Sequence, residues 1–317
     1  CTYGDEYTDN KNLLDLGVVK RSYPHLQVLI ALGGGTASTG FSDAALTDEA
    51  RRTFVKSCLD LYLDTYPDVI DGVDIDWEFP GIGDASRPED KRNLTLLTQE
   101  FRRQLDERSK RTKRSYLLTI AMPTGASLLP FYEIEELAQV TDWFNLMAYD
   151  FHGAWSKTTN FHSPLYAVTD DAYPLNNDDA AVRAYLDAGV SPDKLVLGVP
   201  FYAHGWADVA PENNGLYQRA PKLPKGTFDG SAYTYWDLAE NYIDRNGYVR
   251  YWSDEAKVPW LYSAADRIFI TYDDPESIGY KMAYIREQHL GGAMMWNLSS
   301  DDGSLVRAVF EGLGVRD

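Results

Sequence analysis

Residues 71–80 read DGVDIDWEFP, a stretch in which carboxylates alternate with apolar side chains. Along a β-strand, alternate side chains point to the same face of the sheet. One face of this stretch carries three carboxylates: Asp74, Asp76 and Glu78. The other face carries three apolar residues: Val73, Ile75 and Trp77. We therefore predict a buried strand whose apolar side chains pack against a layer of helices. Asp71 lies on the same face as the apolar residues, so we predict a structural role for it.

Three carboxylates on one inward face are costly, because repulsion and lost hydration both favour the protonated form. At least one pKa should therefore rise, and a carboxyl that keeps its proton near neutral pH can act as a general acid. A calcium site is one alternative, but calcium loops place Gly and carbonyl ligands in a turn. A solvated edge strand is another, and the apolar set argues against it. The stretch thus predicts a catalytic acid.

Apolar strands alternate with helices along the whole chain. The strands are predicted at 27–32, 69–77, 117–122, 143–149, 195–201 and 293–298. The helices are predicted at 47–66, 88–109, 134–138, 178–188, 275–289 and 304–311. This alternation predicts a parallel sheet covered on both faces. Six parallel strands are two short of a closed (β/α)₈ barrel, and no strand is predicted before residue 27.

The alternation is interrupted at 203–267, where twelve aromatic residues occur with many turn-forming residues. We predict a small α+β insertion here, so that the chain divides into a barrel part at 1–202, the insertion at 203–267 and a second barrel part at 268–317. The aromatic content of 13% fits either a large core or stacking on sugar rings.

The composition limits the partners of the protein. A formal net charge of −18 makes nucleic acid and anionic membranes poor partners. The chain has two cysteines, Cys1 and Cys58, and their spacing predicts neither a disulfide framework nor a zinc site. No run of 18 apolar residues predicts a membrane span, and no signal peptide is predicted at the start of the sequence. A secreted enzyme in mature form would look the same, so this pattern does not determine the location.

The acidic strand resembles the D-x-x-D-x-D-x-E motif of family-18 glycoside hydrolases, the chitinases. Three further segments are similar to motifs of that family in the same order: MAYDF (147–151), VPFYAHGW (199–206) and GGAMMWNL (291–298). The segment 203–267, with NGYVRYWSDEAKVPWLY (246–262), resembles the insertion of the deep-cleft, bacterial-type subgroup. The resemblance spans nearly the whole chain.

This resemblance implies a (β/α)₈ TIM barrel with a small α+β insertion domain, its first two strands missing from this chain. It also implies retaining hydrolysis of β-1,4-linked N-acetylglucosamine polymers, assisted by the substrate's own acetamido group, without metal or cofactor. Glu78 would protonate the glycosidic oxygen while the acetamido oxygen forms an oxazolinium ion. Asp76 would orient the acetamide and share a proton with Asp74, and Tyr149 would hydrogen-bond the acetamido oxygen.

The resemblance also implies a set of substrate-binding residues: Met147, Asp150, Tyr202, Trp296, Trp77, Trp155 and His204. Trp296 would form the floor of the sugar site, with core packing as the alternative. Tyr149 could also be a core tyrosine. Trp155 would stack on an outer sugar or anchor its loop.

Two positions depart from the family pattern. Gly35 stands where the family has a stacking tryptophan, which puts one outer sugar site in doubt. His204 replaces an arginine that helps to hold the sugar, and it either keeps a pH-dependent contact or faces solvent. The missing strands would expose two parallel edges, which we expect a partner copy or neighbouring loops to cover.

The sequence thus predicts a secreted chitinase that acts on chitin and chito-oligosaccharides. A lectin-like member that binds without cleaving, an endo-β-N-acetylglucosaminidase and a fragment without function of its own remain alternatives.

Overall fold

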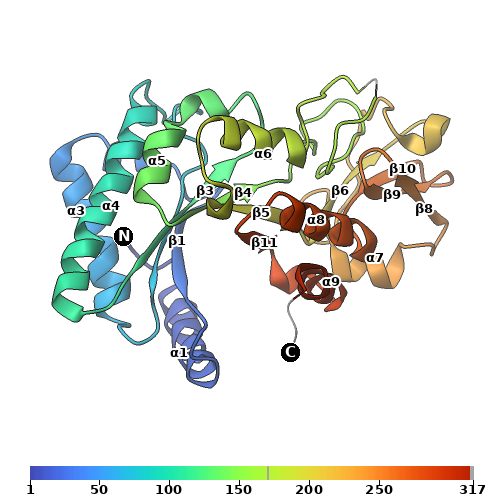
Figure 1. Cartoon of the computed structure of the whole chain (residues 1–317). Helices are drawn as coiled ribbons and strands as arrows, with labels where there is room; N and C mark the ends of the chain where they lie inside the picture. The colour runs from blue at the N-terminus through green and yellow to red at the C-terminus, as the bar shows by residue number, and fades with distance from the viewer. Residues whose placement is uncertain (170, 315–317) are drawn as a thin grey trace. The chain divides into compact units, whose positions relative to one another are not determined.

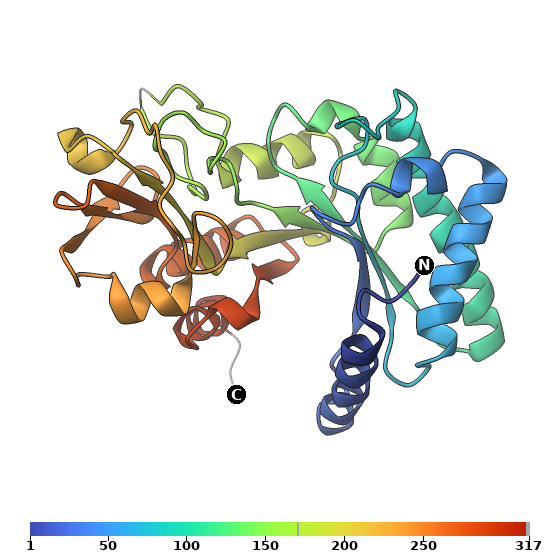
Figure 2. The same ribbon diagram turned by 180° about the vertical axis from the view of Figure 1, so that it is seen from behind.

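The computed structural model describes residues 1–169 and 171–314 (Figure 1; Figure 2). The chain forms two compact units. The first comprises Cys1–Met122 and Leu128–Phe144, and the second comprises Pro123–Ser127 and Asn145–Asp317. Each is described by itself.

The first unit is built on parallel strands in the order β1-β2-β3. Their bounds are β1 Leu29–Gly33, β2 Gly72–Asp76 and β3 Leu117–Pro123. The helices are α1 Glu6–Ser22, α2 Phe41–Ala44, α3 Asp48–Leu59, α4 Asp90–Thr112 and α5 Ile134–Val140. A π-helical turn (Asp60–Asp64) extends α3, and a 3₁₀ turn (Leu129–Phe131) precedes α5. Figures 1 and 2 show α3 and α4 side by side over the sheet.

The helices of the first unit follow from local signals in the sequence. Thr47 caps α3 by accepting a hydrogen bond from the backbone N–H of Ala50 at 3.1 Å. The buried stripe of α4 recurs at helical spacing: Leu94, Leu97, Phe101 and Leu105. By contrast, α1 buries only Leu13 and Gly17 and leaves Leu14 and Val18 exposed.

The second unit contains a parallel pair, β5 (Leu195–Pro200) and β11 (Gly292–Trp296), in which Val196 lies opposite Gly292. Strand β4 (Trp143–Met147) begins in the first unit and ends in the second. The helices here are α6 Asp178–Asp187, α8 Pro275–Glu287 and α9 Ser304–Leu313. A capping box of Asp274 and Ser277 starts α8, and short 3₁₀ turns lie at Pro192–Lys194, Glu212–Gly215 and Leu298–Ser300.

An antiparallel sheet completes the second unit, in the order β7-β6-β10-β9-β8. Its strands are β6 Tyr202–Ala207, β7 Ala232–Thr234, β8 Tyr248–Ser253, β9 Val258–Ser263 and β10 Ile268–Thr271, with α7 Tyr235–Asn241 between β7 and β8. Trp206, Trp260 and Phe269 form its core. Trp206, Trp260 and Tyr262 of the 203–267 segment therefore contribute to a small hydrophobic core.

These elements confirm the predicted fold class. All six predicted parallel strands are present, and α3 to α6, α8 and α9 lie where helices were predicted. Within the part of the chain that the structure describes, no strand precedes β1. The division at residues 203 and 267 stays a prediction. Among the described residues, no helix is both long enough and apolar enough to cross a membrane.

The cysteine prediction was wrong, because Cys1 and Cys58 form a disulfide bridge with their Cα atoms 4.8 Å apart. Cys58 lies on the inner face of α3, and the N-terminal segment runs along that face. The edge-to-face rings of Tyr3 and Tyr62 support the same placement. Two cysteines 57 residues apart give no local signal for this pairing, which depends on the path of the first five residues.

Candidate active site

Strand β2 carries the three carboxylates as its alternation predicts. The apolar side chains are buried, with Val73 at 1% and Ile75 at 0% exposure. Asp74, Asp76 and Glu78 are partly exposed. The hydroxyl of Thr119 on β3 donates a hydrogen bond to Asp74 Oδ1, which fixes the first carboxylate of the row.

The middle carboxylate bears the electrostatic cost of this arrangement. Burial, followed by the charges of Glu78 and Asp74, raises the pKa of Asp76 to about 7. Its Oδ1 atom has no hydrogen-bond partner among the described residues. Near pH 7 the Asp76 carboxyl is therefore about half protonated, so the row carries less negative charge than three ionised carboxylates would.

The loop after β1 forms a backbone cradle around the end of β2. The N–H of Gly34 donates to the carbonyl oxygen of Asp76 at 2.8 Å, and the N–H of Glu78 donates to Ser38 Oγ at 2.9 Å. A Cβ atom at Gly33 would lie 2.0 Å from the carbonyl oxygen of Asp76, so only glycine permits this approach. A Cβ atom at Gly35 would lie 3.8 Å from Glu78 Oε1, at ordinary contact distance.

Asp71 has the structural role that its parity predicts. It is 6% exposed, pairs with Lys20 of α1 and Arg114, and accepts a hydrogen bond from the N–H of Val28 at 2.8 Å. Asp71 therefore ties α1 and the start of β1 to β2.

The assignment of Trp77 to substrate binding is corrected. This side chain is 5% exposed, and its ring stacks on Phe41 with the centroids 5.3 Å apart. Trp77 lies on the same buried face as Val73 and Ile75, as the alternation along the strand predicts.

In the second unit, several predicted site residues gather around the carboxylate of Asp150. The Tyr202 hydroxyl donates to Asp150 Oδ1 at 2.5 Å, and His204 Nε2 lies 2.8 Å from the same oxygen. His162 Nδ1 lies 3.9 Å from it. Although burial opposes ionisation, the two imidazoles hold the pKa of Asp150 well below its usual range. His204 is 8% exposed, so the alternative that it faces solvent was wrong.

Met147 and Tyr149 share a face at the end of β4, while Leu146 and Ala148 between them are fully buried. The Tyr149 hydroxyl lies 3.8 Å from the sulfur of Met294 on β11, and its ring meets that of Tyr202 edge to face at 6.0 Å. Tyr149 is partly exposed.

Two tryptophans of the second unit present large exposed surfaces. Trp296 ends β11 and is 51% exposed, so the core-packing alternative was wrong. Trp155 is 60% exposed, while one face of its ring lies over Gly153 and its edge meets the ring of His204 at 5.6 Å. Trp155 is therefore held in place by its loop and still offers an aromatic surface.

Sequence reasoning missed three residues that shape these groups. Ser38 holds the backbone of Glu78, Thr119 holds Asp74, and His162 approaches Asp150. Thr119 could have been found, because it lies on the strand next to β2 and opposite Asp74 in the register. Ser38 and His162 lie in loops, where the sequence gives no register.

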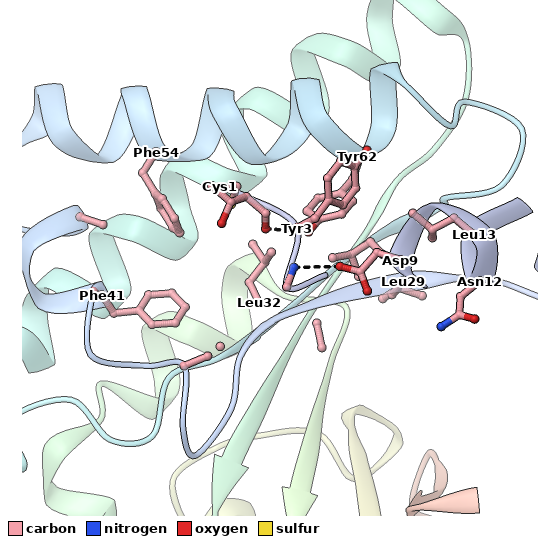
Figure 3. A pocket seen from close by; sticks show the side chains of 18 residues that line it. Cys1, Tyr3, Asp9, Asn12, Leu13, Leu29, Leu32, Phe41, Phe54 and Tyr62 are labelled. Carbon is pink, nitrogen blue, oxygen red and sulfur yellow. Dashed lines mark hydrogen bonds between the residues drawn. The ribbon is translucent and has the colours of Figure 1, made fainter. Parts of the chain in front are cut away.

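A cavity of about 620 Å³ lies in the first unit, between the N-terminal segment, β1 and the helices (Figure 3). Phe41, Phe54 and Tyr62 border it from the helical side, and Leu29 and Leu32 border it from β1. The disulfide partner Cys1 also lines it. We attribute this cavity to the packing of the N-terminal segment against β1.

Comparisons with known proteins identify the family of this chain. The family described as glycosyl hydrolases family 18 matches residues 1–301. The chain is 44% identical to Chitinase A1 of Niallia circulans over 302 residues, which cover 92% of this chain and 43% of that protein. It is 36% identical to Chitotriosidase-1 of Mus musculus, over 94% of this chain and 63% of that protein. The chain thus spans about half the length of these curated relatives.

Solved structures show the same relationship. Chitinase ChiA74 from Bacillus thuringiensis matches with a TM-score of 0.91 and 41% identity, over 95% of this chain and 52% of that chain. A family 18 N-acetylglucosaminidase from Paenibacillus barengoltzii matches with a TM-score of 0.87 and 38% identity, over 95% and 86%. Because the family match covers nearly the entire sequence, the chain belongs to glycosyl hydrolase family 18.

Proposed function

We propose that this protein is a chitinase that hydrolyses β-1,4-linked N-acetylglucosamine polymers with retention, assisted by the acetamido group of the substrate. The observation that carries the proposal is the row of carboxylates on β2, in which the pKa of Asp76 is raised to about 7 beside Glu78. A proton held within the row, next to a carboxyl at the carboxyl end of a parallel strand, is what acid-assisted cleavage requires.

The proposal gives each carboxylate of the first group a role. Glu78 protonates the leaving glycosidic oxygen, and the acetamido oxygen attacks the anomeric carbon to form the oxazolinium ion. As its proton passes to Asp74, the Asp76 carboxylate accepts a hydrogen bond from the acetamido N–H, which orients the group and stabilises the developing positive charge. Asp74, held by Thr119, receives or returns the proton of Asp76 as the charge on the substrate changes.

In the second unit, the side chains bind the sugar rather than react with it. Tyr149 hydrogen-bonds the acetamido oxygen, and Asp150 and Tyr202 contact the distorted ring. Met147 packs beneath the sugar. Trp296 and Trp155 offer the exposed aromatic faces on which sugars stack.

The test is hydrolysis of chitotetraose and of a fluorogenic chitobioside. We expect Glu78→Gln to lower kcat by at least about a hundredfold, the usual contribution of a general acid. Glu89→Gln, which changes an exposed carboxyl immediately before α4, is the matched control. Binding of chitotetraose without turnover by the unmutated chain would overturn the proposal in favour of a lectin-like protein.

A second candidate activity is release of single N-acetylglucosamine units, because the Paenibacillus barengoltzii relative is named an N-acetylglucosaminidase. The first products released from chitotetraose distinguish these two activities. Chitobiose as the first product supports a chitinase, whereas early release of the monosaccharide favours the second candidate. Cleavage of an N-glycan core but not of chitotetraose would instead identify an endo-β-N-acetylglucosaminidase.

Secretion is part of the proposal, and the Cys1–Cys58 disulfide supports it, because such bonds persist in oxidising compartments. We also propose that the chain self-associates through the exposed edges of its parallel sheet. Light scattering after gel filtration tests this: a monomeric mass at high concentration would contradict it.

A further inference from the structure

Three potential metal ligands converge in the second unit. Asp150, His162 and His204 each offer one ligand atom, and these atoms lie within 4.8 Å of one another. Asp150 follows β4, His204 lies on β6, and His162 lies in the long segment between β4 and α6. Two imidazoles and one carboxylate form a donor set suited to divalent transition metals.

The environment of His162 points to a missing ligand. Its side chain is 0% exposed, yet neither Nδ1 nor Nε2 has a hydrogen-bond partner among the described residues. A buried imidazole without partners is costly, and such groups in native structures call for an explanation. Imidazole nitrogens are common ligands of metal ions in proteins.

The spacing of the atoms fits a small cation. Zinc ligands about 2.1 Å from the metal in a tetrahedron lie about 3.4 Å from one another. Asp150 Oδ1 lies 2.8 Å from His204 Nε2 and 3.9 Å from His162 Nδ1, and these distances bracket that value. Small rotations of the rings would equalise them.

We propose that Asp150, His162 and His204 bind a divalent transition-metal ion of the zinc class. Asp150 supplies the carboxylate oxygen of the donor set. The Tyr202 hydroxyl, which donates to Asp150 at 2.5 Å, orients that carboxylate as carboxylate ligands commonly require. The Asp150 side chain is 43% exposed, which leaves a path for the ion and for a fourth ligand from solvent.

The metal would act as an inhibitor rather than as a cofactor, and this step rests on the proposed function. Asp150 and Tyr202 are assigned there to the sugar. An ion that engages Asp150 removes an acceptor from the substrate and competes with it. Zinc should therefore raise the apparent KM for chitotetraose, and a chelator should reverse the effect.

The first experiment measures binding without any substrate. Equilibrium dialysis of the full chain against Zn²⁺ gives the stoichiometry, and Co²⁺ provides visible absorption bands that report its coordination. His25→Gln combined with His289→Asn removes two exposed histidines as the matched control. We expect about one ion per chain in the parent and in this control.

The site variants are His204→Arg and His162→Asn, with Asp150→Asn as a second test of the carboxylate. Each should weaken Zn²⁺ binding by at least about tenfold and remove the Co²⁺ bands. A circular dichroism spectrum like that of the parent verifies that a variant is folded. If binding stays at about one ion in folded His204→Arg and Asp150→Asn, or if the parent binds no ion, the proposal is overturned. Chitotetraose hydrolysis is scored separately, so loss of the proposed function leaves this result unaffected.

Discussion

The hydroxyl of Ser38 accepts a hydrogen bond from the backbone N–H of Glu78 at 2.9 Å, and it also lies 3.1 Å from the carbonyl oxygen of Asp76. One loop side chain thus fixes the backbone on both sides of Trp77, where β2 ends. The position of the Glu78 carboxyl depends on this backbone, so Ser38 acts as a positioning residue.

Replacing Ser38 by alanine should lower kcat more than it changes KM. The loss of the part-buried hydrogen bonds of this hydroxyl should also reduce the free energy of unfolding by about 1 kcal/mol. Steady-state kinetics and urea unfolding measure the two effects. Ser86→Ala, which removes an exposed hydroxyl bonded to Gly83, is the control. An unchanged kcat in Ser38→Ala would show that the backbone of Glu78 needs no such support.

The raised pKa of Asp76 predicts how stability changes with pH. Between its ordinary pKa of 3.8 and about 7, the folded state holds a proton on Asp76 that the unfolded state has lost. Stability from this group therefore falls as the pH rises through that window. Asp76→Asn cannot ionise, so its stability relative to the parent should increase by about 1–3 kcal/mol between pH 4 and pH 8.

Urea unfolding at several pH values measures this difference. Asp84→Asn, a change at an exposed position, provides the baseline. A difference between Asp76→Asn and the parent that does not vary with pH would contradict the raised pKa.

The glycines after β1 should differ sharply in what they tolerate. Gly33 has a φ of 109° and no room for a Cβ atom, so Gly33→Ala should destabilise the protein by more than about 2 kcal/mol. Gly35 has room beside Glu78, so Gly35→Trp should fold. The added ring should strengthen chitotetraose binding by about 1 kcal/mol, or about fivefold.

Thermal unfolding and titration calorimetry test this pair of variants. Gly35→Ala separates the effect of the ring from the effect of losing glycine. A folded Gly35→Trp with unchanged affinity would mean that no sugar binds at this position.

Apolar residues that recur every two positions predicted the strands, and those that recur about every 3.6 positions predicted the helices. Together these patterns predicted most of the fold. The alternation of Val73 and Ile75 with Asp74 and Asp76 fixed both the strand and its buried face. Helix α3 was located by Thr47 and the acidic residues after it. Such local signals succeed because burial selects side chains at regular intervals.

Contacts between distant segments could not be predicted in this way. The Cys1–Cys58 bridge depends on the course of the N-terminal segment. The network of Asp150 joins side chains from two loops and a strand, and His162 carried no signal of its own. Trp77 was wrongly assigned to substrate binding because it lies within the catalytic motif. Its side chain is on the same face of the strand as Val73 and Ile75, and that face is buried.

The disulfide should contribute substantially to stability. Its formation closes a loop with a sequence separation of 57, and a bridge of this kind typically contributes about 2–4 kcal/mol. The variant with Cys1→Ser and Cys58→Ser should therefore unfold at lower temperature than the parent. Calorimetry with and without a thiol reductant measures this, and the serine variant should not respond to the reductant. Equal unfolding temperatures would contradict the prediction.

The same bridge sets how the first unit opens by thermal fluctuation. It encloses α1 and β1 in one covalent loop that is anchored on α3. In the oxidised protein, the backbone amides of β1 should exchange with solvent deuterium only when α3 also unfolds locally. The amides of both segments should therefore be equally protected from exchange. After reduction, α1 and β1 become a separate, weaker cooperative segment, and the protein gains a partially unfolded state that the bridge otherwise suppresses.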